Sequence, residues 1–308
     1  MTTAVLRGRQ RTVHSPAARR EAITGYLFTA PATLGFLVWI VGPMLYSAWL
    51  SLTEWDLLTQ PRFVGLGNYA AMFQDPLFWQ SLKVTFYYTI VSVPLFQALA
   101  FAVALLMNVK VRGITVFRTI YYLPSIVPVV ANALLFAWIF NSDFGLLNAA
   151  LRAVGLPKVL WLQDPRWAMP ALITMSLWGI GGAMLIYLAG LQGVPEQLYE
   201  AAELDGANMW HRFRHVTVPM VSPVIFFNLV LGLIGALQTF TQGYIITNGG
   251  PQNSTLFYAL YLYRQAFTNF KMGYAAAMAW VLFVIVLLLS VLVFRTLGRQ
   301  VYYEDQAR

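Results

Sequence analysis

The sequence has no cysteine and little charge for its length. Of its 308 residues, 10% are charged and 59% are hydrophobic, whereas ordinary soluble domains are about 25% charged. Without cysteine the chain can form neither a disulfide framework nor a thiolate metal site. So few charges cannot cover the surface of a soluble domain, and the composition therefore indicates a polytopic membrane protein.

Familiar catalytic signatures are also missing. None of the four lysines follows a glycine, which excludes the phosphate-binding G-x-x-x-x-G-K-[ST] loop, so we expect no ATP hydrolysis by that route. The three histidines lie outside the long apolar runs, so no Ser–His pair can form within the membrane. We therefore predict that the chain is not an enzyme and binds no cofactor itself.

Two of the histidines, His211 and His215, stand four residues apart, a spacing that can chelate a metal ion from one face of a helix. Arg212 and Arg214 lie between them, and no third ligand is close in the sequence. These features favour a basic helix end at a membrane surface, and we predict no metal site.

Charge-free apolar runs predict six transmembrane helices. A hydrocarbon core about 30 Å thick takes about 20 apolar residues in a helix, and a helix satisfies its own backbone hydrogen bonds in lipid. The longest run is interrupted by a Gly/Pro/Asn cluster at 248–253, which is a loop signal. The predicted spans are 24–52, 84–108, 119–141, 167–190, 219–242 and 272–294. The predicted fold is an all-α membrane domain over 23–295, with tails at 1–22 and 296–308.

The distribution of basic residues predicts that both tails lie in the cytoplasm. An even number of spans puts both ends on one side, and cytoplasmic segments carry an excess of Lys and Arg. That side would hold 13 of the 20 basic residues. They are Arg7, Arg9, Arg11, Arg19, Arg20, Lys110, Arg112, Arg118, Arg212, Arg214, Arg295, Arg299 and Arg308. Topology and anionic lipid thus explain the net charge of +8, and no basic groove indicates nucleic acid.

A polar island separates the fourth and fifth predicted spans. Pro195 suits the first turn of a helix and Gly206 suits its end. The alanines at 201–202 make one face of that helix smooth, so another backbone can approach it closely. A second short helix is expected from about 209 to 216, before Pro219 starts the fifth span. From the residues alone, an ordinary interfacial helix pair that joins two spans is an open alternative.

The island contains Glu200, Ala201, Ala202, Asp205, Gly206, Ala207 and Phe213. This arrangement resembles the EAA loop of binding-protein-dependent ABC importer permeases, whose pattern is close to EAA-x-LDGA-x5-F-x2-I-x-LP. Val216 and Val218 replace the usual Ile and Leu, and these conservative changes leave the docking interpretation intact. The resemblance implies that these seven residues of the loop 195–218 contact an ATPase subunit.

Four further segments resemble signatures of the carbohydrate-uptake branch of that family. They are 63–69 (FVGLGNY), 118–124 (RTIYYLP), 188–192 (LAGLQ) and 247–251 (TNGGP). They occur in the expected order relative to the predicted spans, and the similarity covers nearly all of 26–295. Within the branch the chain is similar to the maltose-type "first" permease, and the short tail after Phe294 agrees with that type.

The resemblance implies a type I ABC importer permease core and a role within a larger assembly. The implied partners are a homologous second permease, two ABC ATPase subunits that bind ATP and Mg²⁺, and an extracytoplasmic solute-binding protein. The implied location is the cytoplasmic membrane of a bacterium or archaeon, where the chain forms half of the path for a sugar or related polyol. The alternatives are a secondary carrier or channel that works without an ATPase, and a membrane scaffold that transports no solute.

Uncharged polar and aromatic residues at bilayer depth are the candidates for the solute path. No ionisable Lys, Arg, Asp, Glu or His lies within the predicted spans, which disfavours a proton-coupled carrier but not a sodium-coupled one. The candidates are Asn132, Trp178, Gly179, Gln238, Thr239 and Gln242. Glycines in membrane helices also permit close helix packing, and that alternative stays open here.

Overall fold

Capping residues mark where several apolar runs become helices. The carboxylate of Asp75 accepts a hydrogen bond of 2.9 Å from the backbone N–H of Leu77 at the start of α4 (Pro76–Met107). Asp164 caps α8 (Pro165–Ser176) in the same way. In both helices proline occupies the first position, where its missing N–H removes no helical hydrogen bond.

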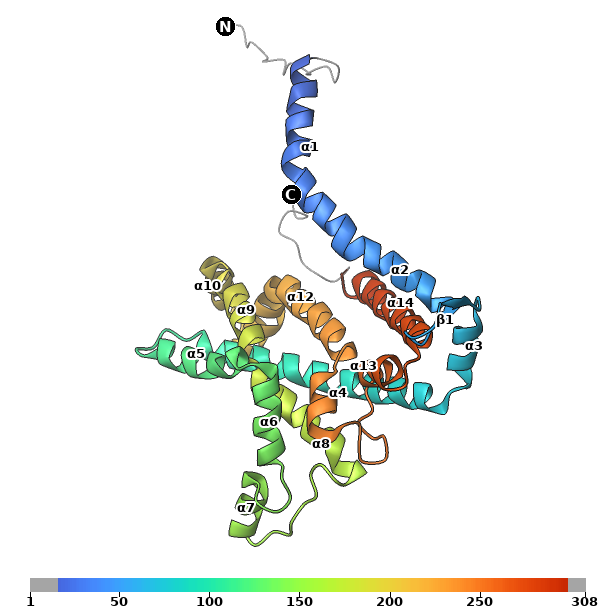
Figure 1. The fold of residues 1–308 in the computed structure, drawn as a ribbon. Coiled ribbons are helices and arrows are strands. Elements are labelled where there is room, and N and C mark those ends of the chain that lie inside the picture. Colours follow the sequence, from blue (N-terminus) through green and yellow to red (C-terminus); the bar gives the residue numbers. More distant parts are fainter. Residues whose placement is uncertain (1–15, 299–308) are drawn as a thin grey trace.

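The computed structural model describes residues 16–298, which are mostly helical (Figure 1). One short antiparallel hairpin pairs β1 (Thr53–Glu54) with β2 (Arg62–Phe63). The other helices, in chain order, are α1 (Pro16–Phe36), α2 (Gly42–Ser51), α3 (Gly67–Gln74), α5 (Ile114–Tyr122), α6 (Val129–Ile139), α7 (Leu146–Ala153), α9 (Gly181–Gln192), α10 (Glu196–Leu204), α11 (Met209–Arg212), α12 (Val218–Leu237), α13 (Tyr258–Tyr263) and α14 (Met272–Thr296).

Within residues 16–298, four continuous helices are long and apolar enough to cross a membrane, and two bent pairs raise the number to six if each pair is one span. The continuous helices are Ala18–Ser51, Pro76–Met107, Met209–Leu237 and Met272–Thr296. The bent pairs are Ile114–Ile126 with Val129–Ile139, and Pro165–Gly179 with Gly181–Gln192. The all-α fold is thereby confirmed, and the predicted six transmembrane segments agree with it when each bent pair is one span.

Three of these segments differ from their sequence-based descriptions. The third predicted span is bent by 95°, because Val127 is extended (ψ 129°) ahead of Pro128 and a residue before proline avoids the helical region. The fourth is bent by 48°. In addition, Pro219 does not start a new helix, because the helix is continuous from Met209 to Leu237 through a π-helical turn.

The helix α4 is the centre of the bundle, since it packs against both α9 and α12. The C-terminal half of α4 shares an apolar cluster with those two helices. α9 and α12 approach each other closely at Gly190, where a Cβ atom would lie 2.8 Å from a methyl group of Val224. This close approach is the packing role that small residues have in membrane helices.

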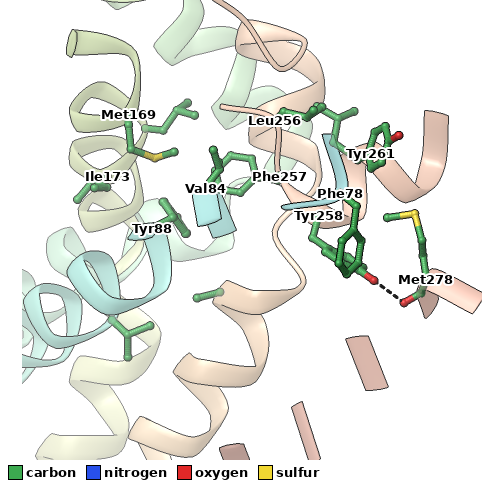
Figure 2. Close-up of a cluster of buried hydrophobic side chains, with 14 of the residues drawn as sticks. Phe78, Val84, Tyr88, Met169, Ile173, Leu256, Phe257, Tyr258, Tyr261 and Met278 are labelled. Atoms are coloured by element: carbon green, nitrogen blue, oxygen red, sulfur yellow. Dashed lines mark hydrogen bonds between the residues drawn. The ribbon is translucent and has the colours of Figure 1, made fainter. Parts of the chain in front are cut away.

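A second apolar cluster joins the N-terminal half of α4 to α8, α13 and α14. Figure 2 shows Phe78, Tyr88 and Phe257 within it. The hydroxyl of the buried Tyr258 donates a 2.8 Å hydrogen bond to the backbone carbonyl of Met278, which fixes α13 against α14. Burial of these aromatic rings holds this end of the bundle together.

The two ends of the molecule carry different features. α10 lies at one end and α7 at the opposite end, while α1 extends away from the other helices (Figure 1). This placement agrees with the predicted topology, in which the loop 195–218 and the segment around α7 lie on opposite sides of the membrane. Most of the predicted tails, residues 1–15 and 299–308, lies outside the described residues.

Asp75 ties together three elements at the α4 N-terminus. Besides its capping bond, its carboxylate accepts hydrogen bonds from the hydroxyls of Tyr261 and Tyr274, the latter at 2.8 Å. Burial raises the pKa of the Asp75 carboxyl, but the hydrogen bonds from these tyrosines and from the backbone lower it, and the net shift is downward. The carboxylate is therefore ionised at neutral pH.

We expect Asp75→Asn to destabilise the protein by about 1–3 kcal/mol at pH 7, because the charge-assisted hydrogen bonds are lost. Since the folded-state pKa is lowered, this stabilisation is present above the unfolded pKa of about 3.9 and is lost as pH falls through the folded pKa. Thermal unfolding in detergent measures it. The matched change Asp143→Asn removes only an exposed pair with Lys158 and should have little effect. Equal melting temperatures for Asp75→Asn and the unmodified protein at pH 7 would contradict this role.

Candidate functional site

The polar island folds as a helix that ends in a defined turn. α10 ends at Leu204, and Gly206 adopts a left-handed conformation with φ 77°. The backbone N–H of Ala207 donates to the carbonyl of Ala202 at 2.9 Å, and that of Gly206 donates to Glu203 at 3.0 Å. This pair of bonds is a Schellman motif. The L-D-G-A sequence therefore encodes a rigid turn, and the predicted helix end at Gly206 is confirmed.

The following helix is also fixed from both sides. Asn208 caps α11 by accepting a 2.9 Å hydrogen bond from the backbone N–H of His211. Arg212 forms a 3.0 Å ion pair with Glu203 across the turn. The hydroxyl of Tyr199 lies 3.0 Å from that of Thr217, which joins α10 to the base of the next helix. These contacts join the two short helices to each other and to the base of the fifth span as one structural unit.

Large apolar side chains on this unit face outward. Leu204 is 90% exposed, Met209 is 81% exposed and Trp210 is 63% exposed, and no residue of α10 is buried. The sequence prediction concentrated on the alanines 201–202 and did not include these three side chains. Contiguous exposed apolar groups mark contact surfaces, so the unit presents a surface for another protein or for lipid.

A chain of aromatic rings leads from this unit into the bundle. Trp210 stacks on Phe213 with ring centroids 5.5 Å apart, and Phe213 lies 6.2 Å from Phe101 of α4. Phe101 in turn packs edge-on against Tyr187 of α9 at 5.2 Å. The predicted loop residue Phe213 therefore connects the exposed surface to α4 and, through Phe101, to α9.

The bundle contains a cavity of about 210 Å³ between α4, the end of α8 and the end of α12. Its polar lining residues carry hydroxyl or amide groups, and none of the lining residues is charged. The lining residues are Tyr88, Ser92, Val93, Phe96, Gln97, Ser176, Gly232, Gly235, Ala236, Thr239 and Gln242. Four of them carry hydroxyl groups: Tyr88, Ser92, Ser176 and Thr239. Such a surface suits a neutral ligand that is rich in hydroxyl groups.

The cavity contains two of the six residues that the sequence indicated for a solute path, Thr239 and Gln242. Gln238, next to Thr239, is exposed.

The other three candidates for the solute path lie away from the cavity lining. Asn132 is on α6, with a buried side-chain oxygen that has no hydrogen-bond partner among residues 16–298. Trp178 and Gly179 lie at the bend between α8 and α9, where Trp178 packs edge-on against Phe136 with ring centroids 6.0 Å apart. Whether any of the six contacts a solute stays a prediction.

Sequence reasoning missed the contribution of α4 to this cavity. Tyr88 and Ser92 are one helical turn apart, and Gln97 follows on the same helix. A polar stripe within an otherwise apolar span was the available signal. The sequence pattern alone does not show which helix this polar stripe faces, because that depends on how α4 packs against segments distant in the sequence.

The chain is similar to a known protein family and to solved structures. Residues 97–299 match the family described as "Binding-protein-dependent transport system inner membrane component". Over 92% of this chain and 96% of the other, the fold resembles that of a chain from the bacterial alginate ABC transporter in complex with alginate pentasaccharide-bound periplasmic protein. The TM-score is 0.80 at 24% sequence identity, so this likeness shows the type I importer fold.

Curated relatives are similar over almost the whole chain. The "Probable ABC transporter permease protein YesP" of Bacillus subtilis is 46% identical, over 95% of this chain and 96% of the relative. The "Lactose transport system permease protein LacF" of Rhizobium radiobacter is 38% identical, over 92% and 97%. The "Trehalose/maltose transport system permease protein MalF" of Thermococcus litoralis is 36% identical, over 91% and 95%. With two thirds of its length matched to the family and close relatives along nearly all of it, the chain belongs to the permease family of inner membrane components of binding-protein-dependent ABC transport systems.

Proposed function

We propose that this permease subunit forms half of the path by which an importer carries a sugar or related polyol across the cytoplasmic membrane of a bacterium or archaeon. The observation that carries the solute class is the uncharged cavity lined by hydroxyl and amide groups. Relatives whose names specify lactose or trehalose and maltose support the same class. Such side chains can hydrogen-bond sugar hydroxyls without the desolvation cost of a buried charge.

The remaining subunits supply what this chain lacks. We infer a homologous second permease that completes the path, two ABC ATPase subunits that bind ATP and Mg²⁺, and an extracytoplasmic binding protein that delivers the solute. The α10 unit, which comprises α10, the turn that follows it and α11 (residues 196–212), would contact an ATPase subunit through the face that contains Ala201 and Ala202. Closure of the ATPases on ATP would then shift the unit and rock the spans between two packings, because packed helix bundles switch between discrete arrangements.

Uptake into proteoliposomes tests this function. The complete assembly, with binding protein and ATP, should accumulate a radiolabelled sugar from a panel that includes lactose, maltose and trehalose. Removal of ATP or of the binding protein should abolish accumulation. Uptake by this chain alone, without ATPases, would instead establish a secondary carrier or channel.

A substitution at the turn after α10 tests whether the α10 unit binds the ATPase subunits. No atom lies within 4 Å of a Cβ built on Gly206, so Gly206→Ala adds no clash. An L-residue with positive φ costs about 1–2 kcal/mol, and we expect the affinity for the ATPase subunits to fall about tenfold. Titration of ATPase subunits onto the purified permease pair measures this. Asparagine tolerates the left-handed region better than alanine, so Gly206→Asn should lose less affinity for the ATPase subunits. The proposal fails if the Gly206→Ala permease binds the ATPase subunits as tightly as the unmodified permease does.

A further inference from the structure

One wall of the cavity is formed by a glutamine whose amide is held by two other helices. Gln97 of α4 is 9% exposed and lines the cavity. Its Nε2 atom donates a 2.7 Å hydrogen bond to the backbone carbonyl of Asn228 on α12. Its Oε1 atom accepts a 2.8 Å hydrogen bond from the hydroxyl of Tyr187 on α9.

These two partners determine which way the amide points. A backbone carbonyl can only accept a hydrogen bond, so the nitrogen of Gln97 must face Asn228. The hydroxyl of Tyr187 can donate, so the oxygen of Gln97 faces Tyr187. A side-chain amide has two N–H donors and two oxygen lone pairs. One N–H and one lone pair of Gln97 therefore have no partner among residues 16–298.

The backbone of α12 is shaped to let this amide approach. Gly232 lies one helical turn beyond Asn228, and a Cβ atom at Gly232 would be 2.7 Å from Nε2 of Gln97. A methyl group at this position would displace the amide. Glycine here is thus required for the position of Gln97, and not only for packing between helices.

Tyr187 does not line the cavity itself. It is 1% exposed and its ring packs edge-on against Phe101 at 5.2 Å. It lies within the apolar cluster of α4, α9 and α12, where a phenylalanine would fill nearly the same space. The hydrogen bond to Gln97 is therefore what the hydroxyl of Tyr187 contributes to the structure.

We propose that Tyr187 is a positioning residue for solute recognition: it orients Gln97 so that one amide N–H and one amide lone pair face the solute. A sugar hydroxyl both donates and accepts hydrogen bonds, so it complements this pair. The inference rests on the proposed function of the cavity as part of the solute path. It assigns solute recognition to Gln97 on α4, and the orientation of that side chain to the buried Tyr187 on α9.

The test is retention of radiolabelled lactose, maltose and trehalose by the complete importer, loaded by its binding protein and arrested with ATP and vanadate. We expect Tyr187→Phe to weaken sugar retention about tenfold, since one hydrogen bond orients the binding group. Tyr258→Phe is the matched control. It removes the hydroxyl of an equally buried tyrosine that bonds to Met278; neither residue lines the cavity, so the change should alter retention less than about twofold.

A double-mutant cycle separates positioning from general destabilisation. Gln97→Leu removes the binding group, so adding Tyr187→Phe to it should cause no further loss. Additive losses would overturn the inference, as would an unchanged affinity in Tyr187→Phe. If Tyr187→Phe fails to assemble, Gly232→Ala displaces the same amide from the other side and should also weaken retention. Equal retention by Gly232→Ala would then overturn the inference. Failure of the unmodified importer to retain any of the sugars would overturn the proposed function as well.

Discussion

Ala202→Asp is expected to abolish solute-stimulated ATP hydrolysis and uptake by the assembled importer. The side chain of Ala202 lies on the face of α10 that we propose to contact the ATPase. An unpaired charge buried in such an interface costs about 3–5 kcal/mol, which corresponds to a loss of affinity of about 100-fold or more. Co-purification of ATPase subunits with the permease pair and ATPase assays in proteoliposomes measure both effects.

The control for this change is Ala150→Asp. Ala150 is another helical alanine, exposed where Ala202 is partly buried, and it lies on α7 at the opposite end of the molecule (Figure 1). It should leave ATPase subunits bound to the permease pair. Normal hydrolysis and uptake in Ala202→Asp would show that energy enters the permease elsewhere.

Gly235→Phe is expected to block the solute path while leaving the assembly intact. Gly235 lines the cavity, and no atom lies within 4 Å of a Cβ built at this position. A side chain at this position therefore begins in open space, and we expect a benzyl group to occupy part of the cavity. Competition with a solute for that space should cost about 1–3 kcal/mol, and we expect uptake to fall about 10- to 100-fold.

Gly235→Phe should retain binding of the ATPase subunits and basal ATP hydrolysis, because the α10 unit is not altered. Gly235→Ala fills much less space and should transport at close to the normal rate. Unimpaired uptake in Gly235→Phe would mean that the solute does not pass through this cavity.

The sequence was sufficient to predict the elements that depend on local chemistry. Apolar run length predicted six spans, and Gly206 predicted the end of the helix in the polar island because few residues adopt positive φ. It was insufficient for the bends. Pro124 and Pro128 lie within an apolar run that is long enough for one straight helix, and length alone does not reveal that Val127 becomes extended there.

In the candidate site too, local sequence indicates some residues, and only tertiary packing reveals the others. Thr239 and Gln242 are polar residues near the end of one apolar run, so their place beside a cavity could be anticipated from local sequence. The roles of Gln97 and Tyr187 could not, because they arise only when α4, α9 and α12 pack together. Residues 97 and 228 are far apart in the sequence, and their hydrogen bond is a consequence of tertiary structure.

The central claim is that the α10 unit receives force from an ATPase on the cytoplasmic side. Because the chain has no cysteine, a single Leu204→Cys substitution places one thiol on this unit, at a side chain that is 90% exposed. Disulfide cross-linking of that thiol to single cysteines on the ATPase subunits is the most direct measurement. We predict a cross-link whose yield changes when ATP binds. Labelling of this cysteine from outside intact cells, with no cross-link to an ATPase subunit, would contradict the claim.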